Sequence, residues 1–262
     1  MAAADDDLMS SHRSHRTQRS GPPGVGKSLV IKSLVKHVTH QTLPEVRGPI
    51  TIVTGKDRRI QIVECPNDIN GMIDLAKVAD LALLVIDGSY GFEMETFEFL
   101  NIMQVHGFPK VIGVLTHLDK FKDPKNLRKT RQLLKHRFWN ETHGSKLFYL
   151  SGLSETHGGK YYSSKETLNL TRFIKSVSKL PPLKWRATHP YLLADRFEDV
   201  THPEKVELDK KCDRNIALYG YLRGCNLKQG MNVHIAGVGD YGLSGVTVLS
   251  DPCPLPSKNK KG

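Results

Sequence analysis

Residues 11–38 read SHRSHRTQRSGPPGVGKSLVIKSLVKHV, and this stretch decides the fold. Residues 21–28 match the pattern G-x-x-x-x-G-K-S, a loop whose backbone N–H groups surround phosphate oxygens between a buried strand and a helix. The residues that follow fit the helix, since Leu29, Ile31, Leu34 and Val35 are apolar and lysines stand between them. The sequence therefore predicts a phosphate site at the start of a helix.

The strand that should precede this loop is not evident. A central parallel strand is buried on both faces and is normally a run of Val, Ile and Leu, whereas residues 11–20 consist of Ser, His, Arg, Thr and Gln. We therefore expect the first strand to be missing and residues 1–20 to be a disordered tail. Without that strand, the chain is expected to be unstable or to bind nucleotide poorly.

Beyond the loop, strand and helix patterns alternate. This alternation predicts an α/β fold with a mostly parallel sheet. Expected strands are residues 50–53 and 60–63, joined as a hairpin, and then 81–87, 110–119 and 146–152. Expected helices are residues 70–80, 94–107, 126–139 and 164–177.

Pro181 and Pro182 interrupt this pattern and predict a domain boundary. After them come short strand-like segments with Gly turns and no helix between them, at residues 189–196, 215–224, 231–237 and 244–251. Such a run predicts a small all-β barrel or sandwich. The expected organisation is a tail at 1–20, an α/β domain at 21–180, a β-barrel at 181–256 and a basic tail at 257–262.

Composition points to an anionic partner. The formal charge is +11 and the isoelectric point is near 9.4, which favours nucleic acid. On the helix predicted near residues 125–137, Arg128, Arg131 and Lys135 lie away from the apolar stripe, so they form either an RNA-phosphate surface or a solvated face. No apolar run reaches the ~20 residues of a membrane span, and the four cysteines form no C-x-x-C zinc pair.

Two later strand ends suggest which base is bound. Asp119 follows one strand and could accept hydrogen bonds from the N1 and N2 donors of guanine, while Ser151 and Gly152 follow the next and could offer a backbone N–H to the guanine oxygen. An ATP-using enzyme remains an alternative, because the hydrophobic strand 81–87 ends in Asp87, a possible metal ligand.

The chain also resembles a known family over residues 21–256. The segments GPPGVGKS, GPITIVTGKDRRIQIVECPND, IDGSYGFEMETFEFLN, KLFYLSG, HPYLLADR and HIAGVGD are similar to the amino-terminal part of the Bms-one-type ribosome-biogenesis GTPases, which are related to translational GTPases. The resemblance implies a P-loop GTPase-like domain followed by a barrel, and an amino-terminal fragment or truncated form of a longer protein. It also implies GTP and Mg²⁺ as cofactors, pre-ribosomal RNA and small-subunit processome proteins as partners, and a nuclear, nucleolar location. We expect neither a membrane partner nor a homo-oligomer.

The resemblance assigns roles to individual residues. Mg²⁺ would be bound by Ser28, Thr51 and Glu64, with Thr51 expected in the loop after the first helix. The catalytic set beside the γ-phosphate would consist of Thr51, Glu64, Asn67 and Asp68. The guanine nucleotide would be bound by Gly21, Gly24, Val25, Gly26, Lys27, Ser28, Thr116, His117, Asp119, Ser151, Gly152 and Leu153.

Several of these residues depart from the pattern of translational GTPases. Glu64 replaces the usual Asp, Asn67 the usual Gly, and Asp68 a water-orienting His, while Thr116 and His117 replace Asn and Lys. A carboxylate beside a γ-phosphate repels negative charge. The sequence therefore predicts slow GTP hydrolysis that depends on a partner, with a non-catalytic RNA- or protein-binding scaffold as the alternative.

Overall fold

The computed structural model describes residues 14–20, 24–55, 58–107, 110–156, 159–177 and 184–251. The chain divides into two compact units. The first comprises Met1–Pro181 together with Val248–Gly262, and the second comprises Pro182–Thr247.

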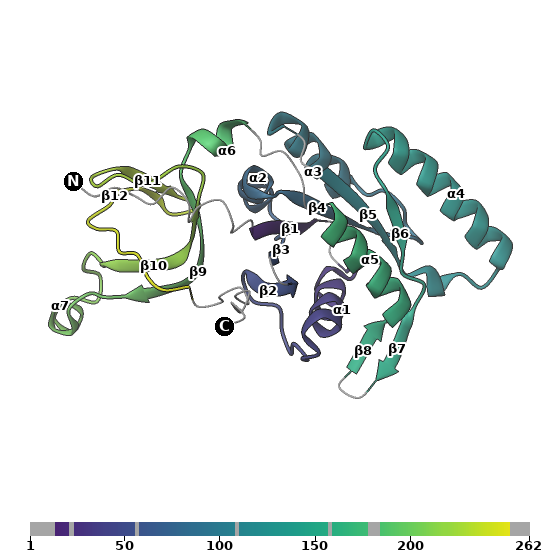
Figure 1. Ribbon diagram of the computed structural model, residues 1–262, viewed down its shortest axis with the longest axis horizontal. Coiled ribbons are helices and arrows are strands. Elements are labelled where there is room, and N and C mark those ends of the chain that lie inside the picture. Colours follow the sequence, from purple (N-terminus) through teal and green to yellow (C-terminus); the bar gives the residue numbers. More distant parts are fainter. Residues whose placement is uncertain are drawn as a thin grey trace, which may run out of the picture. The chain divides into compact units, whose positions relative to one another are not determined.

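The first unit is built on a six-stranded sheet with the order β2-β3-β1-β4-β5-β6 (Figure 1). Its strands are β1 (Ser14–Ser20), β2 (Ile50–Gly55), β3 (Arg58–Glu64), β4 (Leu81–Asp87), β5 (Lys110–Thr116) and β6 (Leu147–Tyr149). β2 pairs antiparallel with β3, and every other pairing is parallel. The predicted hairpin and the mostly parallel α/β sheet are confirmed.

The prediction of a missing first strand is wrong. Residues 14–20, which were expected to belong to a disordered tail, form β1 at the centre of the sheet, with Gln18 in register with Val63 of β3 and Ala82 of β4. A parallel ladder is made by backbone N–H and C=O groups, which every one of these residues carries. Without a strand between them, β3 and β4 would each leave a row of backbone N–H and C=O groups without hydrogen bonds. The need to pair these groups overrides the weak strand propensity of the segment.

Five helices cover the two faces of the sheet. α1 (Lys27–Thr39) and α5 (Ser164–Ser176) contact each other, and Figure 1 shows them on one side of the strands. α2 (Ile69–Val78), α3 (Met94–Val105) and α4 (Pro124–Glu141) pack on the opposite face. The result is a helix–sheet–helix sandwich, and all five helices were predicted.

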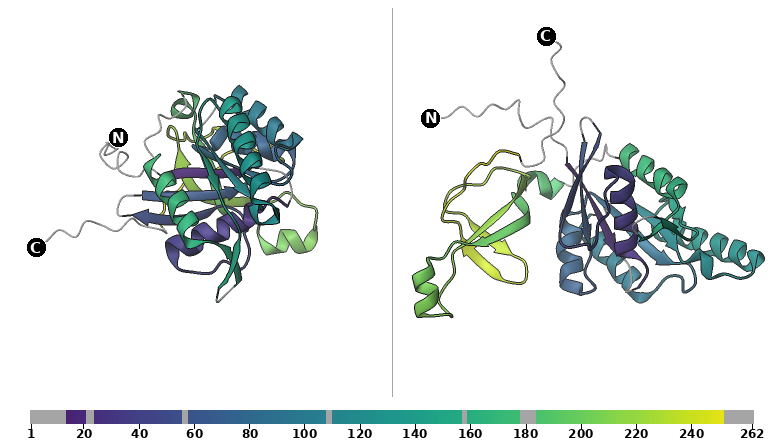
Figure 2. Two further views of the ribbon diagram at one scale, coloured as in Figure 1. Left: turned by 90° about the vertical axis from the view of Figure 1, so that its right-hand side faces the viewer. Right: turned by 90° about the horizontal axis from the view of Figure 1, so that it is seen from below.

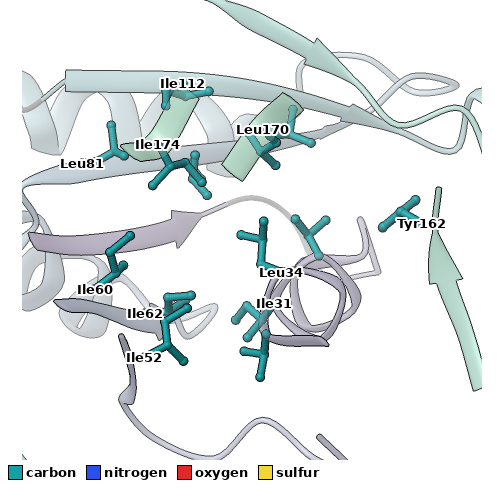
Figure 3. Packing of buried hydrophobic residues seen from close by; sticks show 14 of the residues in the cluster. Ile31, Leu34, Ile52, Ile60, Ile62, Leu81, Ile112, Tyr162, Leu170 and Ile174 are labelled. Atoms are coloured by element: carbon teal, nitrogen blue, oxygen red, sulfur yellow. The ribbon is translucent and has the colours of Figure 1, made fainter. Parts of the chain in front are cut away.

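Alternation along the strands separates two cores. In β4, Leu81 and Leu83 face the α1/α5 layer, while Ala82, Leu84 and Ile86 face α2, α3 and α4. Figure 3 shows the first core, where side chains of α1, α5, β2 and β3 converge. Because both faces of β4 are covered, every residue of this strand is buried.

The second unit contains two antiparallel pairs (Figure 2). β9 (Tyr191–Asp199) pairs with β10 (Ile216–Arg223), and β11 (Asn232–Ile235) pairs with β12 (Gly239–Gly242). Three of the four predicted strands are confirmed. These antiparallel pairs agree with the predicted small all-β domain, and the described pairings fall into two separate sheets.

Two details of this region differ from expectation. Helix α7 (Pro203–Leu208) lies between β9 and β10, and a short helix α6 (Lys184–Thr188) precedes β9, although no helix was expected. The predicted strand at residues 244–251 is also wrong, because Leu243–Asp251 has no strand pairing. Asp251, which belongs to the first unit, instead forms an ion pair with the buried Arg59 of β3.

Candidate functional site

The phosphate loop leads from β1 into α1. Gly24 and Gly26 have φ angles of 80° and 89°, a left-handed conformation that residues with a Cβ rarely adopt. A Cβ on Gly26 would also come within 3.0 Å of the Tyr162 hydroxyl oxygen. Val25 is buried behind the loop, and the backbone N–H groups at the start of α1 form the positive end of the helix. Gly21 lies outside the described residues.

Both functional side chains of the loop contact the segment that follows β3. The Lys27 ammonium donates a hydrogen bond to the side-chain oxygen of Asn67, and the Ser28 hydroxyl donates to Glu64 Oε1 over 2.8 Å. Burial lowers the pKa of Lys27, and the electrostatic effects of Cys65 and Glu64 act in the opposite direction. Lys27, Ser28, Glu64 and Asn67 are therefore brought together as the resemblance implied.

Two members of the predicted catalytic set, Asp68 and Thr51, make structural contacts outside the phosphate loop. Asp68 caps α2 by accepting a hydrogen bond from the backbone N–H of Gly71 over 2.7 Å. The resemblance placed Thr51 in a loop, whereas the strand pattern placed it in a strand at residues 50–53. The structure has Thr51 in β2, paired with Gln61 of β3. That placement follows from the alternation of β2, which turns Ile52 into the core and continues the sheet through Thr51.

Thr116 connects the base region with the phosphate loop. Its buried hydroxyl donates to the carbonyl oxygen of Val25 over 2.8 Å and lies 3.3 Å from the carbonyl oxygen of Ile86. His117, the next residue, has a φ of 54° and turns the chain from β5 into a short 3₁₀ helix (Leu118–Lys120). The threonine thus ties the end of β5 to the loop that would hold the phosphates.

Asp119 and Gly152 meet beside this turn. A Cβ on Gly152 would lie 3.5 Å from the Asp119 Cβ, so the ends of β5 and β6 converge. Asp119 is exposed, and its carboxylate has no hydrogen-bond or ion-pair partner among the residues described. Leu153 begins β7 (Leu153–Thr156) and is 44% exposed. The geometry brings the predicted base-contacting residues together with an acceptor left open.

Asp87 is the most heavily bonded carboxylate of this edge. Oδ1 accepts from the Ser89 backbone N–H over 2.7 Å and from its hydroxyl over 2.5 Å, while Oδ2 lies 2.8 Å from His117 Nδ1 and 3.0 Å from Lys120 Nζ. Burial acts to raise the pKa of this carboxyl, but the Ser89 bonds and the charges of Lys120 and His117 hold it below the ordinary value. Both carboxylate oxygens of Asp87, the residue that the ATP alternative assigned to a metal, thus contact protein groups.

Sequence reasoning missed two residues near the site. Glu166, in the first turn of α5, accepts from the backbone N–H of Ser151 over 3.1 Å and from its hydroxyl over 2.5 Å. Tyr162 belongs to the unpredicted hairpin of β7 and β8 (Gly159–Tyr162) and packs beside the phosphate loop. Neither has a signal in the sequence, because their partners are distant along the chain.

The basic surface predicted on α4 divides into two kinds of side chain. Arg128 and Lys135 are exposed, whereas Arg131 is half-buried with its guanidinium 4.0 Å from the centre of the Tyr149 ring. Leu134 and Phe138 are buried as predicted. Trp139, four residues after Lys135, is 56% exposed and extends the same face.

Within the ranges that the structure covers, no cluster of three His, Cys, Asp or Glu side chains could hold a metal ion. Ser28 and Glu64 offer two oxygen ligands at the phosphate loop, which suits Mg²⁺ because this ion takes few protein ligands and completes its shell with water and phosphate oxygens. None of the described helices has the length and apolarity that a membrane crossing requires.

Comparison with known proteins agrees with this geometry. The family "Elongation factor Tu GTP binding domain" matches residues 28–187, more than half of the chain, and the AARP2CN (NUC121) domain matches residues 179–252. The chain belongs to the elongation factor Tu GTP-binding domain family.

Relatives with high identity are ribosome biogenesis proteins. The chain is 59% identical to the human ribosome biogenesis protein BMS1 homolog over 92% of its own length, which is 18% of that protein. It is 56% identical to ribosome biogenesis protein bms1 of Schizosaccharomyces pombe, covering 92% of this chain and 21% of the relative. The resemblance predicted from the sequence is confirmed, and the chain spans about a fifth of the length of these relatives.

Among solved structures, translation elongation factor SelB from Methanococcus maripaludis in complex with the GTP analogue GppNHp has a similar fold. The TM-score is 0.57 at 17% identity, covering 88% of this chain and 46% of the SelB chain. At this identity the likeness supports the predicted GTPase-like fold alone.

Proposed function

We propose that this chain binds GTP with Mg²⁺ and is the nucleotide-binding part of a ribosome biogenesis factor. One observation carries the proposal: the Thr116 hydroxyl joins the end of β5 to the phosphate loop at Val25, and Asp119 and Gly152 converge beside it. Phosphate-binding and base-binding groups thereby occupy one edge of a parallel sheet, where such folds bind nucleotides.

Each group at this edge has a defined task. The backbone at Gly24–Gly26 and the start of α1 would surround phosphate oxygens, and Lys27 would place a charge on them. Ser28 and Glu64 would hold Mg²⁺, directly or through water, and the ion would neutralise phosphate charge when bound. Asp119 would accept the N1 and N2 donors of guanine, a pair that adenine lacks.

Hydrolysis is expected to be slow without a partner. Asn67 holds the phosphate-loop lysine, so nucleotide phosphates must share or replace this contact. Asp68 caps α2 and has no free role as a base, and Thr51 is held in β2. A partner protein or RNA would then supply the missing water-orienting group. Turnover that remains absent with pre-ribosomal particles would favour the scaffold alternative.

Nucleotide titration tests this proposal. Fluorescent GTP, XTP and ATP analogues are titrated into the wild-type chain and into Asp119→Asn, with and without Mg²⁺. The wild type should prefer GTP, and Asp119→Asn should shift preference towards xanthine because an amide donates where the carboxylate accepted. Lys27→Ala should weaken all three. Equal binding of ATP and GTP by the wild type would refute guanine recognition.

We also propose that α4 contacts pre-ribosomal RNA through Arg128, Arg131 and Lys135. Arg128 and Lys135 are exposed on a chain with a formal charge of +11, and Trp139 extends their face. Neutralising the three cations should weaken RNA binding similarly for different sequences and flatten its salt dependence. Unchanged salt dependence would move the RNA site elsewhere. We also propose that the chain has small-subunit processome proteins as further partners and a nucleolar location. We propose no membrane partner and a monomeric state.

A further inference from the structure

The loop after β6 is held from two sides. Its first residue, Leu150, donates its backbone N–H to the carbonyl oxygen of Leu115 in β5 over 2.9 Å. Its second residue, Ser151, is held by the Glu166 carboxylate through the backbone N–H at 3.1 and 3.3 Å and through the hydroxyl at 2.5 Å. Bonds to an ionised acceptor are the stronger kind, so Glu166 is a firm anchor for Ser151.

The other end of this anchor is fixed in the protein core. Glu166 lies in the first turn of α5, where the helix dipole favours a negative charge. One and two turns further on, Leu170 and Ile174 are buried in the α1/α5 core. Packing of α5 therefore fixes the helical turn that carries Glu166, and the Glu166 carboxylate in turn holds Ser151.

The contacts of Leu150 and Ser151 fix the position of Gly152. It follows Ser151 directly, lies against Asp119, and its backbone N–H has no hydrogen-bond partner among the residues described. An N–H held open beside a carboxylate acceptor suits a base that carries a carbonyl oxygen next to two donors, as guanine does.

We propose that Glu166 is a positioning residue for guanine recognition: it holds Ser151 so that the N–H of Gly152 points at the guanine O6 while Asp119 accepts from N1 and N2. The proposal rests on GTP binding as proposed above. Rigidifying a loop in its binding conformation raises affinity by removing the cost of ordering it. Glu166 acts through the loop and does not itself contact the nucleotide.

A base analogue separates positioning from general stability. In 6-thioguanosine triphosphate a weakly accepting sulfur replaces O6, while the N1 and N2 donors remain. Affinities for GTP and for this analogue are measured with the 262-residue chain as wild type, Glu166→Ala, Glu166→Gln and Asn169→Ala. Asn169 is the matched control because it lines a groove of about 590 Å³ together with Glu166 and is exposed one turn further along the helix.

Glu166→Ala should lower GTP affinity about tenfold and affinity for the thio analogue by about twofold or less, so that discrimination falls. Glu166→Gln keeps the side-chain volume and one acceptor, so it should give an intermediate loss and serves as the test if the alanine variant does not fold. Asn169→Ala should match the wild type. Equal losses for both nucleotides, or no loss in either Glu166 variant, would overturn the proposal. A wild type without preference for GTP over ATP would instead refute the underlying function.

Discussion

Replacing Asp87 with asparagine changes one oxygen of a buried carboxylate into an amide and leaves its shape intact. The Asn oxygen can still accept from the Ser89 N–H and hydroxyl, as Asp87 Oδ1 does at 2.7 and 2.5 Å. The new NH₂ group faces Lys120 and His117, which now contact Oδ2 at 3.0 and 2.8 Å. The substitution therefore removes two charge-assisted contacts and leaves the two bonds from Ser89 with a neutral acceptor.

The magnitude follows from the exposure of the partners. A hydrogen bond to a charged group contributes about 1.5–3 kcal/mol, so two give an upper range of about 3–6 kcal/mol. The Lys120 side chain is 45% exposed and that of His117 is 27% exposed, so both regain hydration when released. We expect Asp87→Asn to lower the free energy of unfolding by about 2–3 kcal/mol.

Urea denaturation near neutral pH measures this loss. The control is Asp74→Asn, whose carboxylate is 39% exposed and 4.0 Å from Lys77, a surface pair whose removal should cost about 0.5 kcal/mol or less. GTP affinity should also fall for Asp87→Asn, because His117 and Lys120 flank Asp119. If Asp87→Asn costs no more than the control, Asp87 is not the anchor of the base-binding turn.

The effect should depend on pH with a definite sign. The pKa of Asp87 is lower in the folded chain than its ordinary 3.8, so the unfolded chain takes up this proton first as the pH falls. The contribution of the carboxylate is complete above 3.8 and is lost as the pH falls through the folded value. The stability gap between wild type and Asp87→Asn should be smaller at pH 3 than at pH 5, and a gap that widens on acidification would contradict this assignment.

Three further substitutions test the fold and the site. Gln18→Pro should lower the free energy of unfolding by more than about 3 kcal/mol, since it removes a backbone hydrogen-bond donor from the central strand β1. The control Gln18→Ala should have a small effect on the free energy of unfolding, and equal urea midpoints for the two variants would exclude residues 14–20 from the sheet. Gly113→Ala should cost about 1–3 kcal/mol, because its Cβ would lie 2.4 Å from a Leu147 carbon, and Gly245→Ala, with open space, should be neutral by the same assay. Asp68→Ala should cost about 1 kcal/mol as a lost helix cap without slowing single-turnover GTP hydrolysis; slower turnover would restore its catalytic role.

Local patterns made much of this protein predictable. The G-x-x-x-x-G-K-S loop, the fully apolar β4 and the helical spacing of Leu134 and Phe138 each depend on residues close in sequence, so the α/β fold and the order of the site could be predicted. The residues at the ends of β5 and β6 were predicted to contact the same base, because open α/β sheets bind ligands at the carboxyl ends of their strands. The convergence of Asp119 and Gly152 follows from that rule.

Features that depend on residues far apart in the sequence were decided by the tertiary structure alone. Composition argued against a strand at Ser14–Ser20, but the free edges of β3 and β4 supply ladder partners that no local pattern displays. The bond between Lys27 and Asn67, the cluster around Asp87 and the hold of Glu166 on Ser151 likewise join residues that only packing brings together. Hydrophobic and backbone periodicities are local properties of a sequence, whereas the satisfaction of a backbone edge or a buried charge is a property of the whole fold, and for this protein the second kind of requirement set the central strand and the precise form of the site.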